Sequence, residues 1–226
     1  MTWSWESITA PLVRNLVVDA NDGIIATAGI VEGFAGAGAT GTTIVIAAFS
    51  AMMAGGISLG GAKYAEEAAE IGARQALIDE ERRQLDLSPD EEMAELASLY
   101  EKKGLSSTLA AQVASELSAK DALAAHVDAE HGLSLRTEPP APMFMAVTAG
   151  LAYAAGSAVP LLAAVLAPEA WRVWVTFLAV LISLGVTSLI LVAAGGTNTA
   201  RTLARSVAVG MIAMLLTLTA GALIQR

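Results

Sequence analysis

Long apolar runs recur along this chain, and they limit its possible folds more than any other feature. A membrane-spanning helix needs about 20 predominantly apolar residues. Five runs of about that length lie at residues 12–36, 42–62, 143–166, 171–194 and 203–224. The 55% share of hydrophobic residues and the mean hydropathy of +0.59 exclude an ordinary soluble domain. The sequence therefore predicts an all-α, multi-pass integral membrane protein with five transmembrane helices.

The first apolar run carries three acidic residues, Asp19, Asp22 and Glu32. A charged side chain at the bilayer centre costs at least ~2.5–3.5 kcal/mol, so such residues usually line a pathway or a cavity. At a rise of 1.5 Å per residue, Asp22 lies about 12 Å past Arg14 along a helix, and Glu32 lies about 15 Å farther. We therefore predict that these carboxylates line a cation route. The alternative, strongest for Asp19, is a carboxylate that caps the helix or reaches the membrane interface.

Between the second and third runs lies a hydrophilic insert, residues 63–138. It holds 17 of the 22 Asp and Glu residues and 8 of the 13 Lys and Arg residues, so the whole net charge of −9 resides there. Such a segment repels nucleic acid and anionic lipid and attracts cations. The expected organisation is residues 1–62 with the first two spans, a helical lobe at 63–138, and residues 139–226 with the last three spans.

The insert also carries groups that can bind a metal ion, including the only two histidines of the chain. Residues three or four apart share a helix face. Three such pairs fall on three predicted helices: Glu81 with Gln84, Glu92 with Glu95, and His126 with Glu130. Helices that present such donors inward build metal sites in bundle proteins, and oxygen with nitrogen ligands suits Mn²⁺, Fe²⁺ or Zn²⁺. The alternative for each acid here, Glu91 included, is a solvated helix face.

Other features narrow the possible chemistry. Met52 and Met53 in the second run are candidate soft ligands, although methionines also simply fill space between helices. The chain has no cysteine, which excludes thiolate metal sites and disulfides. No nucleophile–base set, phosphate loop or nucleotide motif occurs, so the sequence predicts no enzyme, no catalytic residue and no organic cofactor.

Glycines spaced four residues apart occur in the first two runs, as Gly29 with Gly33 and Gly56 with Gly60. This spacing lets two helix backbones approach closely. It is compatible with packing inside one subunit and equally with a seam between two subunits.

The basic residues set the expected orientation, because cytoplasmic loops are enriched in Lys and Arg. A cytoplasmic N-terminus places Arg14, Arg201, Arg205 and the insert inside, and Arg172 and Arg226 outside. The prediction is therefore a cytoplasmic N-terminus and lobe and an external C-terminus. Trp3 and Trp5 are expected at the membrane interface. The compact chain and the lack of a targeting extension favour a bacterial plasma membrane.

Several sequence pieces together resemble the vacuolar iron transporter family. They are Asp22-Gly23 with the glycine-rich run that follows, Ser58 and Tyr64, and the segments ELASLYEKKGL at 95–105, AQVASEL at 111–117 and GSAVP at 156–160. The resemblance covers nearly the whole chain. It implies a homodimer with five spans per subunit and a cytosolic helical metal-binding lobe between spans two and three. It also implies movement of Fe²⁺, and often Mn²⁺, out of the cytosol in exchange for protons.

Carried over by residue, the resemblance places the family's first-span aspartate at Asp22. It places the lobe glutamates at Glu81, Glu92, Glu95 and Glu130. Four positions depart from the family pattern. Leu59 stands where the family usually has methionine, and His126 where it often has methionine. Lys63 and Gln84 stand where glutamate is common. Loss of a thioether removes a soft ligand that favours Fe²⁺ over harder ions.

The leading hypothesis is a dimeric exporter of Fe²⁺ or Mn²⁺, with Zn²⁺ and Co²⁺ as further candidates and protons as the counter-ion. The lobe would capture the ion, and Asp22, with Glu32 and Asp19, would bind it in the membrane. The main alternative is a membrane-anchored metal sensor that transports nothing. A carboxylate-bridged metal oxidase is the weakest alternative, because such sites use two Glu-x-x-His pairs and the chain has none.

Overall fold

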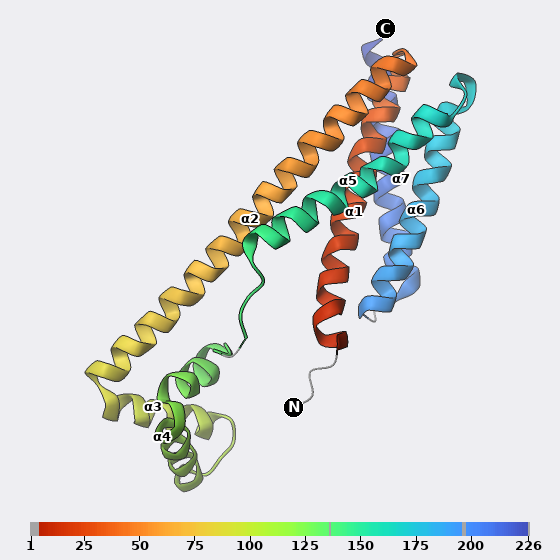
Figure 1. Cartoon of the computed structure of the whole chain (residues 1–226). Helices are drawn as coiled ribbons and strands as arrows, with labels where there is room; N and C mark the ends of the chain where they lie inside the picture. Colours follow the sequence, from red (N-terminus) through yellow and green to blue (C-terminus); the bar gives the residue numbers. More distant parts are fainter. Residues whose placement is uncertain (1–4, 136, 196–197, 226) are drawn as a thin grey trace. The chain divides into compact units, whose positions relative to one another are not determined.

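The computed structural model describes residues 5–135, 137–195 and 198–225, and this part of the chain is built from helices and their connections (Figure 1). The expectations for Trp3 and Arg226 fall outside the described residues. The chain divides into two compact units. One, which we call the bundle, comprises Met1–Tyr64 and Pro142–Arg226, and the other, the lobe, is Ala65–Ala141.

The bundle contains α1 (Trp5–Gly36), the first part of α2 (Gly41–Leu87), and four later helices. These are α5 (Pro142–Leu166), the short 3₁₀ helix η1 (Glu169–Trp171), α6 (Arg172–Gly195) and α7 (Thr199–Ile224). Four helical segments are long and apolar enough to cross a membrane: those in α2, in α5, in η1 with α6, and in α7. This confirms a multi-pass membrane protein. Helix α1 is long enough at 32 residues but carries five charged residues and is not among the four.

Helix α1 lies at the centre of the bundle and packs against α5, α6 and α7 (Figure 1). Two buried apolar clusters hold it there. Ile24 and Ala28 of α1 pack with Val180, Leu184 and Met214, which come from α6 and α7. One turn farther along α1, Val31 packs with Ile44, Ala48 and Ala164 from α2 and α5. The helix that carries the three acids is therefore the one that the other helices surround.

Glycines allow the closest helix crossings in the bundle. A Cβ added at Gly156 of α5 would overlap the Ala20 carbonyl of α1, and one added at Gly23 would overlap the Tyr153 carbonyl of α5. The paired glycines of the sequence also face this chain's own helices. Gly29 and Gly33 face Thr217 of α7, and Gly56 and Gly60 face Gly150 and Ala146 of α5. Their spacing therefore serves packing within one subunit.

The lobe contains the second part of α2, α3 (Pro89–Lys102) and α4 (Ser107–His131). Pro89 occupies the start of α3, where its missing N–H costs nothing. Helix α4 bends at Asp121, whose backbone leaves helical geometry and whose Oδ1 accepts a 3.0 Å hydrogen bond from the Ala124 N–H. The second half of α4 is thus capped like a new helix.

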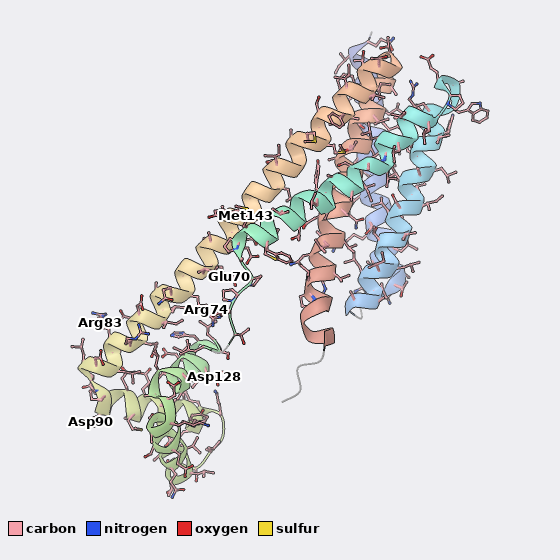
Figure 2. All side chains as sticks on the ribbon, viewed as in Figure 1. Glu70, Arg74, Arg83, Asp90, Asp128 and Met143 are labelled. Carbon is pink, nitrogen blue, oxygen red and sulfur yellow. The ribbon has the colours of Figure 1, made fainter. Side chains whose placement is uncertain are left out.

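The segment after α4 is attached to α2 within the lobe. Gly132 ends α4 with a φ of 65°, a left-handed conformation that glycine adopts without steric cost. Arg74 of α2, labelled in Figure 2, donates hydrogen bonds to the carbonyls of Ser134 and Thr137. These contacts hold the end of α4, and the histidine there, close to α2.

Candidate functional site

Three helices of the lobe each turn one metal-binding side chain toward the others. Glu81 of α2 is 3% exposed, Glu92 of α3 is 7% exposed, and His126 of α4 is fully buried. Ile78 and Leu96 are buried three or four residues from Glu81 and Glu92, on the same helix faces, and support these orientations. Val127, the residue after His126, is buried as well. We call Glu81, Glu92 and His126 the inner group.

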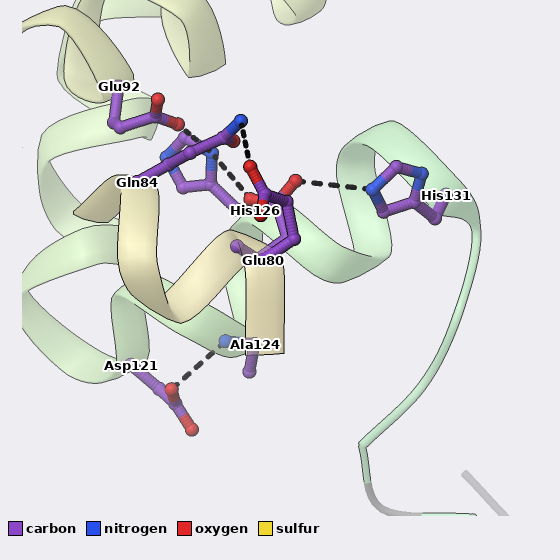
Figure 3. A network of polar contacts seen from close by, with 8 residues as sticks. Glu80, Gln84, Glu92, Asp121, Ala124, His126 and His131 are labelled. Carbon is purple, nitrogen blue, oxygen red and sulfur yellow. Dashed lines mark hydrogen bonds and ion pairs between the residues drawn. The ribbon is translucent and has the colours of Figure 1, made fainter. Parts of the chain in front are cut away.

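The inner group has the dimensions of a metal site. His126 Nδ1 lies 3.4 Å from Glu92 Oε2 and 3.8 Å from Glu81 Oε2 (Figure 3). One ligand atom from each residue lies within 4.8 Å of the other two. Among the described residues, Glu81 Oε2 and both imidazole nitrogens of His126 have no hydrogen-bond partner. A buried polar atom without a partner costs about 1–3 kcal/mol, and a divalent cation held between the carboxylates and the imidazole would satisfy two of these atoms, Glu81 Oε2 and His126 Nδ1.

A second group adjoins the first and shares Glu81 with it. Glu81, Glu130 and His131, which we call the outer group, also bring ligand atoms within 4.8 Å of one another. His131 Nε2 lies 3.1 Å from Glu81 Oε1 (Figure 3). Glu130 is exposed and His131 is 24% exposed, so the outer group is open to solvent. An ion could thus reach the outer group first and meet Glu81 there.

The electrostatics of the two groups favour a cation. Burial raises the pKa of the Glu81 carboxyl, and the nearby Glu130 adds to the effect while His131 opposes it. Burial likewise raises the pKa of Glu92, which His126 partly offsets. A divalent ion among these carboxylates would reverse both shifts, because an opposite charge stabilises the ionised form.

The remaining lobe residues singled out in the sequence lie outside both groups. Gln84 donates a 3.2 Å hydrogen bond to Glu80, a residue whose pKa is lowered by its hydrogen bonds from Arg83. Glu91 and Glu95 are exposed on α3. Met52 and Met53 belong to the bundle part of α2, where Met53 is 47% exposed. The structure therefore assembles four of the six predicted lobe ligands: Glu81, Glu92, His126 and Glu130.

Sequence reasoning missed one member of the outer group, His131. Adjacent residues on a helix point in different directions, so the pairing of His126 with Glu130 did not include it. The available signal was that His131 is one of only two histidines in the chain and lies in the same acidic segment. The ligand atoms of both groups are oxygen and nitrogen, a set that suits Mn²⁺, Fe²⁺ and Zn²⁺.

The three acids of α1 occupy different environments in the bundle. Asp19 is 5% exposed and Glu32 is fully buried, and neither carboxylate oxygen of Glu32 has a hydrogen-bond partner among the described residues. Asp22 is exposed at the surface of the single chain and lines a cavity of ≈ 580 Å³. Asn21 and Arg14 place polar groups beside Asp22 in this cavity, while Val18 and Ile25 give it apolar surface as well.

Polar contacts between helices fix the backbone around Asp22. The Ser157 hydroxyl of α5 donates a 3.1 Å hydrogen bond to the Gly23 carbonyl, and the Thr187 hydroxyl of α6 donates a 2.6 Å bond to Asn21 Oδ1. These contacts hold α1 between α5 and α6 on either side of Asp22. The carboxylate is therefore presented from a rigid support, which favours a defined binding geometry.

The chain is similar in sequence to one protein family and to several known proteins. The sequence profile of the VIT family matches residues 13–222. The chain is 34% identical over 125 residues to a vacuolar iron transporter of Acanthamoeba castellanii (strain ATCC 30010 / Neff), a match that covers 55% of this chain and 45% of that protein. It is 29% identical over 167 residues to vacuolar iron transporter 2 of Oryza sativa subsp. japonica, covering 73% and 68% of the two chains. A match to vacuolar iron transporter 1 of Eucalyptus grandis has 27% identity over 162 residues and covers 70% and 64%.

Proposed function

This chain belongs to the VIT family, a family of transporters rather than enzymes, and we propose that it exports Fe²⁺ or Mn²⁺ from the cytosol in exchange for protons. The observation that carries the proposal is the inner group, in which buried oxygen and nitrogen atoms converge without hydrogen-bond partners among the described residues. Such an arrangement is unfavourable for a protein that binds no ion. The metal ion is the substrate, and the lobe captures it.

The carboxylates of α1 are the proposed binding positions in the membrane. Asp22 accepts the ion that the lobe has captured, Glu32 provides a second buried position, and Asp19 lies one turn before Asp22. A carboxylate binds a cation only when ionised, and a proton that arrives from the other side neutralises it and releases the ion. Exchange of metal for protons therefore needs no group beyond these acids.

A homodimer and a fifth span complete the proposal. Asp22 faces the outside of the single bundle, where lipid would solvate a carboxylate poorly. A second copy that covers this side of α1 would enclose the route around Asp22, so α1 would be the fifth span. The distribution of the basic residues favours a cytoplasmic N-terminus and lobe and an external C-terminus.

The donor set bears on which ion is preferred. The inner and outer groups contain no thioether, and position 59 is leucine. Because soft ligands are absent there, we propose that Mn²⁺ is carried at least as well as Fe²⁺, with Zn²⁺ and Co²⁺ as competitors. Lys63 lies where the bundle part of α2 ends, and its positive charge disfavours the binding of a cation at that position.

Flux measurements in proteoliposomes test the proposal. The purified full-length protein is reconstituted with a pH gradient, and Fe²⁺, Mn²⁺, Co²⁺ and Zn²⁺ movement is followed with a trapped metal-sensitive dye. Flux of Mn²⁺ and Fe²⁺ that depends on the pH gradient is expected, together with a pH change inside the liposomes that shows protons moving in the opposite direction. Metal binding by calorimetry without flux of any of the four ions would contradict transport and favour the membrane-anchored sensor.

A further inference from the structure

The cavity beside Asp22 is lined by three arginines that the transport proposal does not use. Arg14 comes from α1, and Arg201 and Arg205 come from the first turns of α7. Asp22 is the one acid among the described lining residues, so the cavity wall is strongly positive. None of the three arginines forms an ion pair with a described residue. A cavity that presents several unpaired guanidinium groups is suited to an anion, and guanidinium binds phosphate with paired hydrogen bonds.

The N-terminus of α7 adds further donors at the same place. Asn198 caps the helix by accepting a hydrogen bond from the Arg201 N–H, and its side chain and that of Ser206 also line the cavity. The first turn of a helix of 26 residues carries a partial positive charge and free N–H groups. The helix end and the arginines therefore act on one cavity with the same sign of potential.

The cavity wall is amphipathic, and two of its helices, α1 and α7, carry the same order of charged and apolar residues. Helices α1 and α7 begin at the same end of the bundle and run in the same direction (Figure 1). On α1, Arg14 is followed one turn later by Val18, and on α7, Arg205 is followed one turn later by Val209. Both valines line the cavity and are 46% and 49% exposed. Each helix thus presents a cation first and an apolar surface about 6 Å deeper along the helix.

From this arrangement we infer that the cavity binds the phosphate of an anionic phospholipid, with the acyl chain against the valine side. Free phosphate would satisfy the arginines but leave the apolar wall uncovered, whereas a zwitterionic lipid brings no net charge to them. The position of the arginines at the end of membrane-spanning helices fits this class of ligand, because basic pockets between such helices bind anionic headgroups. The site is separate from the metal groups of the lobe, but it borders the proposed ion position in the membrane, because Asp22 also lines the cavity.

Lipid binding is tested on the full-length protein in detergent by native mass spectrometry, with phosphatidylglycerol and phosphatidylcholine as probes. The wild-type protein is expected to retain phosphatidylglycerol preferentially. The triple variant Arg14→Gln, Arg201→Gln, Arg205→Gln should lose that preference by about tenfold or more, since each basic residue near the headgroup strengthens the binding of anionic lipid. The triple Arg→Lys variant should keep most of the preference, which excludes a mere folding defect.

A charge-matched control removes three positive charges from exposed lobe positions by Arg82→Gln, Arg83→Gln and Lys120→Gln. This variant should bind phosphatidylglycerol like the wild type. An unchanged preference in the Arg14, Arg201 and Arg205 glutamine variant would overturn the assignment. Equal retention of both lipids, with inorganic phosphate alone bound in an arginine-dependent way, would also overturn it, because the ligand would then be a soluble anion.

Discussion

His126 Nδ1 lies 3.4 Å from Glu92 Oε2, yet neither nitrogen of this fully buried imidazole has a hydrogen-bond partner among the described residues. A distance this long leaves room for a third atom that both side chains contact. Glu81 Oε2, 3.8 Å from the same nitrogen, completes the set. This spacing is compatible with three ligands around one ion, and the predictions for the lobe depend on that interpretation.

Loss of Glu81 should abolish metal binding by the lobe, because Glu81 belongs to both the inner and the outer group. In isothermal titration calorimetry with Mn²⁺, Glu81→Gln is expected to weaken binding by more than ~100-fold, beyond the effect typical of outer-shell partners. Glu95→Gln is the matched control, since Glu95 is exposed and outside both groups. Equal losses in the two variants would indicate a general charge effect instead of defined ligands.

Loss of His131 should impair the outer group and spare the inner one. His131→Asn removes the ligand 3.1 Å from Glu81 Oε1 but leaves Glu92 and His126 in place. We expect the titration to lose its weaker, solvent-facing step while the tighter step persists. His126→Asn should have the opposite effect. A His131 variant that binds Mn²⁺ with wild-type affinity and stoichiometry would show that the outer group holds no ion.

In the metal-free protein, Glu81 and Glu92 should make the folded state less stable as pH rises, whereas a carboxylate in an ordinary salt bridge makes it more stable. Burial raises the pKa of Glu81 and Glu92, so the folded lobe holds these protons more tightly than the unfolded chain. Their contribution favours folding below the unfolded pKa of about 4.3 and is lost as pH rises through the raised folded pKa. Thermal unfolding should therefore show Glu81→Gln gaining stability relative to wild type as pH rises.

With saturating Mn²⁺, the wild type should instead be more stable than Glu81→Gln. A ligand at 100 times its Kd stabilises the folded state by about 2.7 kcal/mol, and only the wild type can gain this. A Glu81→Gln protein that is less stable than wild type without metal at every pH would contradict the proposed cost of the buried carboxylate.

The contact between α1 and α5 should not tolerate a methyl group. A Cβ at Gly156 would overlap the Ala20 carbonyl, so Gly156→Ala should destabilise the bundle by about 1–3 kcal/mol, the usual cost of overpacking. Gly61→Ala is the control, since no atom lies within 4 Å of the added Cβ there. Circular dichroism melts in detergent compare the two variants. Similar melting of both would mean that this close crossing does not limit stability.

Part of this architecture could be read from the sequence because its signals are local. Pro89 and Gly132 mark the start of α3 and the end of α4, and Asp121 marks the bend between the two halves of α4. Four of the five apolar runs correspond to helices long and apolar enough to cross a membrane, and the confirmed family resemblance followed from short segments along the chain.

The inward face of each lobe helix was harder to predict. Residues three or four apart share a helix face, but their spacing does not say whether that face points into the lobe or to solvent. Glu92 and Glu95 were equal candidates, but buried Leu96 turns Glu92 inward and leaves Glu95 in solvent. His131 enters the outer group only because Gly132 ends the helix and Arg74 holds the following segment against α2. The arginine cavity depends on α1 and α7 lying side by side, which local sequence does not encode.

The central claim is that the Asp22 carboxylate binds the transported ion, and Mn²⁺ flux into proteoliposomes tests it most directly. Asp22→Asn is compared with wild type and with Glu169→Gln, a control acid exposed on η1. All three must reconstitute equally and bind Mn²⁺ equally through the lobe. The account predicts that Asp22→Asn reduces flux by at least ~10-fold while the control stays at the wild-type rate. Undiminished flux in Asp22→Asn would contradict the account.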